Sequence, residues 1–143
     1  MIAPLSPYAP AWQIAERVRS GTASARAVVD LHLDRIAALD PTLNAYTDLT
    51  EDRARVQAEE IDRAAQAGDP LPPLAGVPFA VKNLCDIDGV TTRAGSKINR
   101  DHPPATADGE LVARLTRAGA ILLGALNMGE YAYDFTGENF HDG

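Results

Sequence analysis

Residues 76–84 read Gly-Val-Pro-Phe-Ala-Val-Lys-Asn-Leu, and they carry the clearest signal for the fold class. The apolar density over residues 77–84 is typical of a strand that is buried in a parallel sheet. A second stretch of the same character, residues 118–126, follows a helical pattern over residues 108–117. A strand, a helix and a strand in this order predict a parallel α/β unit.

The part of the chain before this unit, residues 1–70, is predicted to be mainly helical. Apolar residues at helical spacing indicate a first helix that Gly21 ends, and Thr22 or Ser24 can cap a second helix. Asp40-Pro41 is expected to stop the second helix, because proline disfavours helical geometry in the residue before it. Residues 1–70 therefore supply helices to pack beside the strands.

A short extended segment and a third helix are predicted next. Residues 43–49 read as the extended segment, and Thr50 is placed to cap the third helix. The proline-rich residues 68–73 cannot continue a helix and form a connector. Residues 71–143 are then the lysine-bearing α/β part of the chain, and the prediction is an α/β fold with N-terminal helices and the opening strands of a sheet.

Composition excludes several classes of function. Hydrophobic residues make up 45% of the chain and charged residues 23%, which is typical of a folded globular protein. A formal net charge of −7 repels polyanions, so no direct nucleic-acid contact is expected. The lone Cys85 lacks a partner for an intramolecular disulfide, which favours a reducing compartment, and we expect the cytoplasm.

The sequence gives no sign of export or membrane insertion. Met1 leads into a proline-rich stretch, whereas a secretion signal has a basic region followed by an apolar run. No window approaches the roughly 18 consecutive apolar residues that a membrane helix needs. We therefore expect no membrane contact.

Lys82 stands where the strand over residues 77–84 would be expected to continue apolar. Burying an ammonium is costly, and the usual response is a lowered pKa that favours the neutral amine, which can act as a base. The alternative is a strand-end position, with the stem of the lysine over apolar surface and its charged group in water. Periodicity alone favours this second interpretation.

The surrounding motifs resemble those of the amidase signature family. The resemblance is carried by residues 76–84, by Thr-Thr-Arg-Ala-Gly-Ser-Lys at 91–97, and by Gly-Ala-Leu-Asn-Met-Gly-Glu-Tyr at 124–131, in the family's order and approximate spacing. It extends over essentially the whole chain. Within the family, residues 95–101 and 130–133 look most similar to the carboxybiuret hydrolase large-subunit branch.

This resemblance implies the N-terminal part of a single amidase domain, with a mixed sheet that is incomplete in this chain. It also implies that Lys82, neutral in a buried site, accepts a proton from a serine held in a cis peptide. That serine activates a second serine, which attacks an amide carbonyl and forms an acyl-enzyme. The implied partners are a small-molecule amide substrate and a small companion protein, and a homo-oligomer stays open.

The chain departs from the family pattern in its serines. No Gly-Gly-Ser-Ser-Gly-Gly run occurs before Gly143, so residues 1–143 alone are expected to be catalytically incomplete. Leu84 and residues 121–126 are expected to form an exposed apolar face in the absence of later strands. Gly129 and Asp134 also differ from the residues that relatives commonly carry, which leaves the conformation of the last ten residues open.

Three further residues are assigned supporting roles. Gly95 and Ser96 are expected in a loop that lines the site, with the serine hydroxyl bonding backbone or orienting Lys82. Asn127 is a candidate pocket residue, although a cap on the following turn, completed by Glu130, is the simpler interpretation. No cofactor is expected, and the scattered histidines argue against a metal site.

Two other functions stay open. The first is an aminoacyl-tRNA amidotransferase A-like subunit, which keeps the hydrolytic chemistry and passes ammonia to a tRNA-linked substrate. The second is a short non-catalytic protein that binds a partner, which the absent serines would favour.

Overall fold

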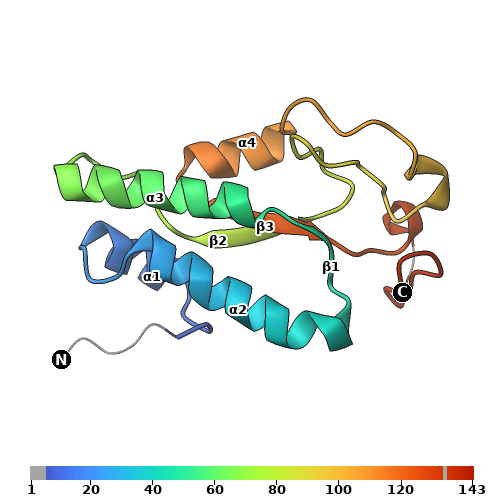
Figure 1. The fold of residues 1–143 in the computed structure, drawn as a ribbon, viewed down its shortest axis with the longest axis horizontal. Coiled ribbons are helices and arrows are strands. Elements are labelled where there is room, and N and C mark those ends of the chain that lie inside the picture. Colours follow the sequence, from blue (N-terminus) through green and yellow to red (C-terminus); the bar gives the residue numbers. More distant parts are fainter. Residues whose placement is uncertain (1–5, 134) are drawn as a thin grey trace.

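The structure is a computed structural model that describes residues 6–133 and 135–143. The expectations about Met1 and Asp134 fall outside the described residues. The fold has three layers: a small sheet lies between helices that pack on its two faces (Figure 1). Within the described ranges, no helix is both long enough and apolar enough to cross a bilayer.

Among the described residues, the sheet has three strands: β1 (Tyr46–Leu49), β2 (Pro78–Lys82) and β3 (Ile121–Leu126). Their order is β1-β3-β2, so the strand that is last in sequence is central. β3 is parallel to β2 and antiparallel to β1. The predicted mixed sheet and the parallel unit formed by β2 and β3 are therefore confirmed.

In the part of the chain that the structure describes, four α-helices cover the sheet. Three of them precede β2, and α2 and α3 lie side by side and antiparallel (Figure 1). The fourth connects β2 to β3, as the strand-helix-strand pattern predicted. Their bounds are α1 (Ala11–Arg19), α2 (Ala25–Leu43), α3 (Glu51–Ala67) and α4 (Glu110–Arg117).

β3 divides the apolar residues into two clusters. Ile121 and Leu123 pack with α1, α2 and α3, whereas Leu122 and Ala125 pack with α4 and the loop after β2. Simple alternation would not place Leu122 and Ala125 together, because they are three residues apart. The register shifts between Phe79 and Ala80, where Leu123 is left unpaired on β3, and this bulge moves Ala125 to the face of Leu122.

The expected exposed apolar face is wrong for β3. Residues 121–125 are buried, because β3 has a strand on each edge and helices on each face. Leu84 is 45% exposed, as expected.

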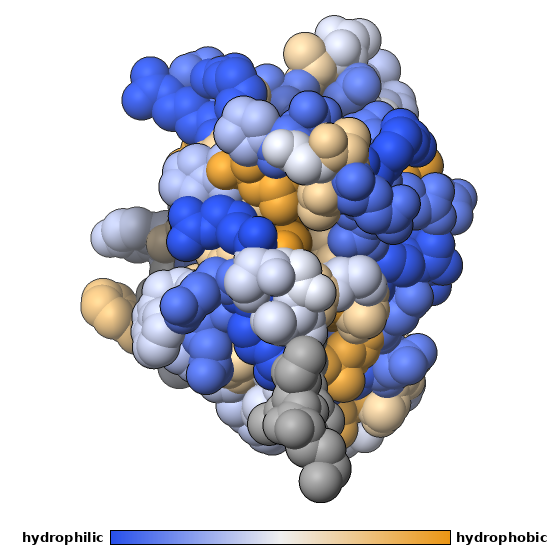
Figure 2. Space-filling view, turned by 90° about the vertical axis from the view of Figure 1, so that its left-hand side faces the viewer, coloured by the Kyte–Doolittle hydropathy of each residue, from blue (hydrophilic) through white to orange (hydrophobic). Residues whose placement is uncertain are grey.

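The view of the end where α3 finishes shows a mainly hydrophilic surface with narrow apolar strips (Figure 2). At the C-terminal part of the chain, large apolar side chains are exposed instead: Tyr131, Tyr133, Phe135 and Phe140.

The end of α2 differs from the prediction. The helix does not stop at Asp40-Pro41 but continues to Leu43, with Asn44 in the left-handed conformation after it. Pro41 lies in the last turn, so the missing N–H leaves only one late carbonyl without its helical partner. The Asp40 carboxylate also accepts the backbone N–H of Ala45 at 2.7 Å, which fixes the turn into β1.

The start of α2 is capped twice. The Ser24 hydroxyl accepts the N–H of Ala27 at 3.0 Å, so this predicted cap is confirmed. The carboxylate of Asp62, on α3, accepts the N–H groups of Ala25 at 2.6 Å and Arg26 at 3.0 Å. A negative charge at this end of α2 also interacts favourably with the helix dipole. The two hydrogen bonds of Asp62 join α3 to the start of α2.

Thr50 does not have the predicted capping role. Its side chain makes no cap bond to α3, because the hydroxyl donates to the carbonyl of Leu122 at 2.9 Å. Its backbone N–H donates to the carbonyl of Leu123 at 2.9 Å. Thr50 therefore fastens the start of α3 to the bulge in β3.

An ion pair joins α3 to the segment before α4. Both terminal nitrogens of Arg53 donate to the Asp108 carboxylate, at 2.7 and 2.5 Å, and Asp108 also accepts the N–H of Asp88 at 3.0 Å. The hydrogen bond from Arg53 is the main reason why the pKa of Asp108 lies below its usual value. Folding therefore favours the charged form of Asp108.

Replacing Asp108 by asparagine should destabilise the chain by about 2 kcal/mol at neutral pH. Because the folded pKa is the lower one, the stabilisation is present above about pH 4 and is lost as the pH falls through the folded pKa. Urea unfolding of wild type and D108N should thus converge in acid. D69N, at an exposed position, should change stability little at any pH. A constant difference between wild type and D108N across the acid range would contradict this account.

Candidate functional site

Lys82 is the last residue of β2, and its register partner is Leu126, the last residue of β3. Both strands are parallel, so their carboxyl ends form one edge of the sheet, where ligand sites of α/β proteins commonly lie. The side chain of Lys82 is exposed, and its ammonium has no hydrogen-bond or ion-pair partner among residues 6–133 and 135–143. In this structure Lys82 thus has the strand-end, solvent-exposed position.

Asn83, the next residue, is 1% exposed and points into a polar network. Its Nδ2 donates to Thr47 Oγ1 at 2.8 Å and to Asp48 Oδ2 at 3.1 Å. Its Oδ1 accepts the backbone N–H of Arg93 at 2.7 Å. The guanidinium of Arg93 in turn donates to Asp48 Oδ1 at 2.9 Å. β1, the end of β2 and the loop after residue 90 are therefore tied together beside Lys82.

Gly95 lies in the loop that follows this network. Its φ of +68° is in the left-handed region, which favours glycine. A Cβ there would lie 2.6 Å from the carbonyl oxygen of Met128 and 2.9 Å from Asn139 Nδ2. The Gly95 carbonyl accepts from the same Asn139 amide at 2.9 Å. Only glycine fits, because the loop packs directly against the C-terminal segment.

Ser96 is completely buried, and its hydroxyl donates to Glu130 Oε1 at 2.5 Å. Two short 3-10 helices flank this contact, η1 (Lys97–Asn99) and η2 (Glu130–Ala132). The backbone N–H of Tyr131 donates to the carbonyl of Ala94 at 2.8 Å. The partner of the Ser96 hydroxyl is thus a carboxylate 34 residues away, which the sequence did not indicate.

Asn127 follows β3 at the same sheet edge as Lys82. Its Oδ1 accepts the N–H of Met128 at 2.8 Å. Its Nδ2 donates to the carbonyls of Asn44 at 3.1 Å and Gly143 at 2.9 Å. Asn127 therefore joins the end of α2, the end of β3 and the last residues of the chain.

Sequence reasoning missed Asn83 and Asn139. Asn139 is 7% exposed, and its amide donates to the carbonyls of Gly95 and Met128 while its Oδ1 accepts two backbone N–H groups. A polar residue directly after an apolar strand, as in Asn83, was the available signal. For Asn139 the sequence carried none that we can identify.

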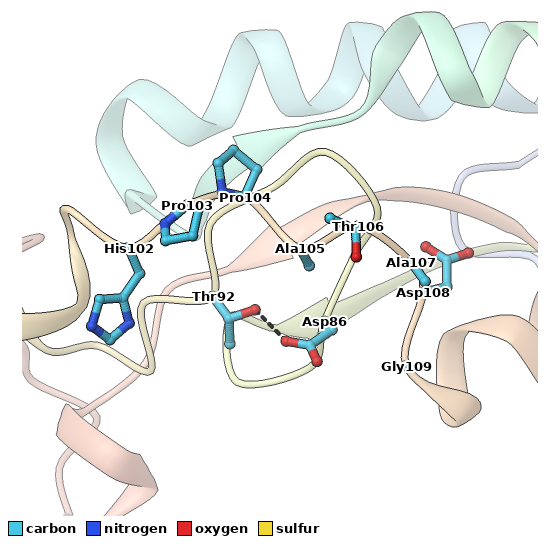
Figure 3. A pocket seen from close by; sticks show the side chains of 10 residues that line it. All are labelled: Asp86, Thr92, His102, Pro103, Pro104, Ala105, Thr106, Ala107, Asp108 and Gly109. Atoms are coloured by element: carbon cyan, nitrogen blue, oxygen red, sulfur yellow. Dashed lines mark hydrogen bonds between the residues drawn. The ribbon is translucent and has the colours of Figure 1, made fainter.

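A cavity of about 600 Å³ lies away from these residues (Figure 3). It is formed mainly by the loop that leads into α4, and Thr92 Oγ1 donates to Asp86 Oδ1 at 2.6 Å across its side. None of the predicted site residues lines it. Its lining consists of Asp86, Thr92, His102, Pro103, Pro104, Ala105, Thr106, Ala107, Asp108 and Gly109. In the described ranges, no group of three or more histidine, cysteine, aspartate or glutamate residues is arranged to hold a metal ion.

Comparison with known proteins gives a consistent result. The Amidase family profile matches residues 27–142. The AtzE subunit of 1-carboxybiuret hydrolase from Pseudomonas sp. (strain ADP) is 57% identical over 131 residues, which are 92% of this chain and 29% of that protein. The A subunit of glutamyl-tRNA(Gln) amidotransferase from Prochlorococcus marinus (strain MIT 9313) is 46% identical over 118 residues, or 82% of this chain and 24% of that protein.

Solved structures agree with the sequence comparisons. A structure described as a vestigial protein complex that reveals the origins of an s-triazine catabolic enzyme matches with a TM-score of 0.92 and 56% identity, over 94% of this chain and 30% of that one. A bacterial aryl acylamidase of the amidase signature family matches with a TM-score of 0.88 and 31% identity, over 96% and 29%. The chain thus spans less than a third of the length of these relatives. With its lysine-bearing strand, its mixed sheet and these matches, the chain belongs to the amidase signature family.

Proposed function

We propose that residues 1–143 form the N-terminal part of a single amidase domain, with residues 1–70 mainly helical and residues 71–143 bearing the lysine. The full-length enzyme hydrolyses the C–N bond of a small non-peptide amide. The observation that carries this proposal is the position of Lys82 at the carboxyl end of β2, within the residues that match the Amidase family profile. The compartment proposed is the cytoplasm, because Cys85 is a free thiol.

In this proposal Lys82 is the general base. As a neutral amine it takes a proton from one serine, which takes the proton of a second, nucleophilic serine. The nucleophilic oxygen bonds to the amide carbon, the C–N bond breaks, and the nitrogen leaves as ammonia or an amine after receiving a proton. Water then hydrolyses the acyl ester and restores the serine. The ammonium is exposed in this structure, so another part of the enzyme has to exclude water from it.

The two serines are proposed to come from outside residues 1–143. The chain has four serines, and none lies in a Gly/Ser-rich run of the family kind. Ser96 is the serine nearest to Lys82 in sequence, but it is buried and donates to Glu130. We assign Ser96, Gly95 and Asn127 supporting roles in shaping the site, and we expect residues 1–143 alone to be inactive.

A carboxylated urea derivative is the substrate class to test first, with 1-carboxybiuret as its representative. The identity to the 1-carboxybiuret hydrolase protein, 57%, exceeds the 46% to the amidotransferase protein. The net charge of −7 gives no support to contact with tRNA by this part of the chain. Because both of these relatives are subunits, we also propose that the enzyme binds a small companion protein. Assembly with further copies of itself is a second option for its quaternary structure.

Reading the gene beyond codon 143 tests the proposal. A Gly/Ser-rich segment with two serines should follow, and the full-length protein should release ammonia or an amine from 1-carboxybiuret. The alternative amidotransferase function would instead require genes for its companion proteins and a glutamyl-tRNA substrate. A gene without such a segment in any frame, whose 143-residue product is monodisperse and melts cooperatively, would favour the non-catalytic protein and contradict the proposal.

A further inference from the structure

Asn83 has every polar group of its side chain occupied. Its amide makes two donor contacts and one acceptor contact, to Thr47, Asp48 and the backbone of Arg93. A buried amide without partners would cost stability, so this full set of bonds holds the side chain in one orientation. Asn83 is also the neighbour of Lys82 in sequence, at the point where β2 ends.

The backbone of Asn83 adds two contacts in other directions. Its N–H donates to the carbonyl of Leu126 at 2.9 Å, which extends the pairing of β2 with β3 by one residue. Its carbonyl accepts the N–H of Ala94 at 2.7 Å. One residue therefore contacts β1, β3 and the loop over residues 93–96, and these three segments surround the end of β2.

An ion pair supports the far side of this network. Asp48 and Arg93 are 2.9 Å apart, and their side chains are 26% and 28% exposed. The carbonyl of Arg93 also accepts from Asn99 Nδ2 at 2.9 Å. The charge of Asp48 is thus shared between the guanidinium of Arg93 and the amide of Asn83. The loop cannot shift without breaking the Arg93–Asp48 pair and the bond from the Arg93 N–H to Asn83.

We propose that Asn83 is a positioning residue for the base. It fixes the end of β2 against β1 and against the loop over residues 93–96, so that Lys82 keeps one place relative to Gly95 and Ser96. This inference rests on the proposed function, because it needs Lys82 to take part in the reaction. Small displacements of a base lower the rate of proton transfer much more than they weaken substrate binding.

A merely structural role would give a different result. If Asn83 only stabilised the fold, its replacement would lower the melting temperature and leave kcat per folded enzyme unchanged. A control for stability is available in Asp62, which caps α2 from α3 and, among the described residues, makes no hydrogen bond to β2 or to the loop over residues 93–96. Asp62→Ala removes two hydrogen bonds to backbone N–H groups at a partly buried position away from the end of β2.

The test compares N83A, D62A and K82A in the full-length enzyme with 1-carboxybiuret. N83A should lower kcat by about 30-fold or more and change KM by less than about threefold. D62A should keep its kcat despite a lowered melting temperature. Where N83A does not fold, N83D takes its place: it keeps the shape and the acceptor for Arg93 but sets an oxygen against Asp48, and kcat should again fall.

The outcomes separate the two proposals. A kcat of N83A, or of N83D where N83A does not fold, within threefold of wild type overturns the positioning role if K82A is inactive. An equal fall of kcat in D62A overturns it as well, because the effect then follows stability. If K82A itself keeps its activity, the proposed function fails, and the inference about Asn83 fails with it.

Discussion

Lys82→Ala should lower kcat of the full-length enzyme by at least about 10³-fold while the protein still folds. The loss follows from the proposed role of the amine, because without a base the nucleophilic serine keeps its proton. Folding should survive, since the side chain is exposed and makes no polar contact with residues 6–133 or 135–143. Turnover of 1-carboxybiuret and the thermal melting curve provide the two measurements.

The chain supplies its own control in Lys97, which is the only other lysine in the sequence. Lys97 is also exposed and lies at the start of η1, beyond the loop that contains Ser96. Lys97→Ala should therefore leave kcat within about twofold of wild type. Added small primary amines should restore part of the activity of K82A. They should not raise the activity of K97A above that of wild type. Near-normal turnover by K82A would remove this lysine from the mechanism.

Gly124→Ala should destabilise the chain by about 3 kcal/mol or more, or prevent folding altogether. Gly124 lies in β3 opposite Leu49 of β1 and Ala80 of β2. A Cβ there would overlap the carbonyl oxygen of Asp48 and lie 3.1 Å from Leu49 Cα. Both contacts are backbone, so no side-chain rotation can relieve them. Urea unfolding monitored by circular dichroism measures the loss.

Gly109→Ala is the matched control for this steric effect. A Cβ at Gly109 would come no closer than 3.5 Å to the backbone of Asp86, which is ordinary contact. This glycine caps α4 with an ordinary extended backbone, so the change should cost less than about 1 kcal/mol. If G124A were as stable as G109A, β1 and β3 would have to be farther apart than the structure places them.

The sequence predicted the central part of this fold from local patterns. The apolar residues 77–84 and 118–126 identified β2 and β3, because buried strands are almost uniformly apolar, and the helix between them required a parallel pairing. Ser24 was identified by its position before an apolar helical stretch. Each of these signals depends on neighbours within a few residues, which the sequence displays directly.

Long-range contacts explain what the sequence did not predict. Asn83 bonds to Thr47, which is 36 residues away, and Arg93 bonds to Asp48 at a separation of 45. The burial of residues 121–125 depends on the insertion of β3 between two earlier strands, which no local pattern specifies. At Pro41 a valid local rule failed, because the Asp40 side chain fixes the turn that follows and the helix has only two residues left.

The central position of β3 also has a consequence for synthesis on the ribosome. Among the described residues, β1 and β2 both pair with β3 and not with each other, so neither gains this neighbour until residues 121–126 have left the exit tunnel. Both helices of the α2–α3 pair precede β3 in the sequence, so their contacts can form earlier. Until β3 emerges, newly made chains therefore carry two strands whose β3-facing edges are unpaired, a period in which chaperone binding would protect them from association.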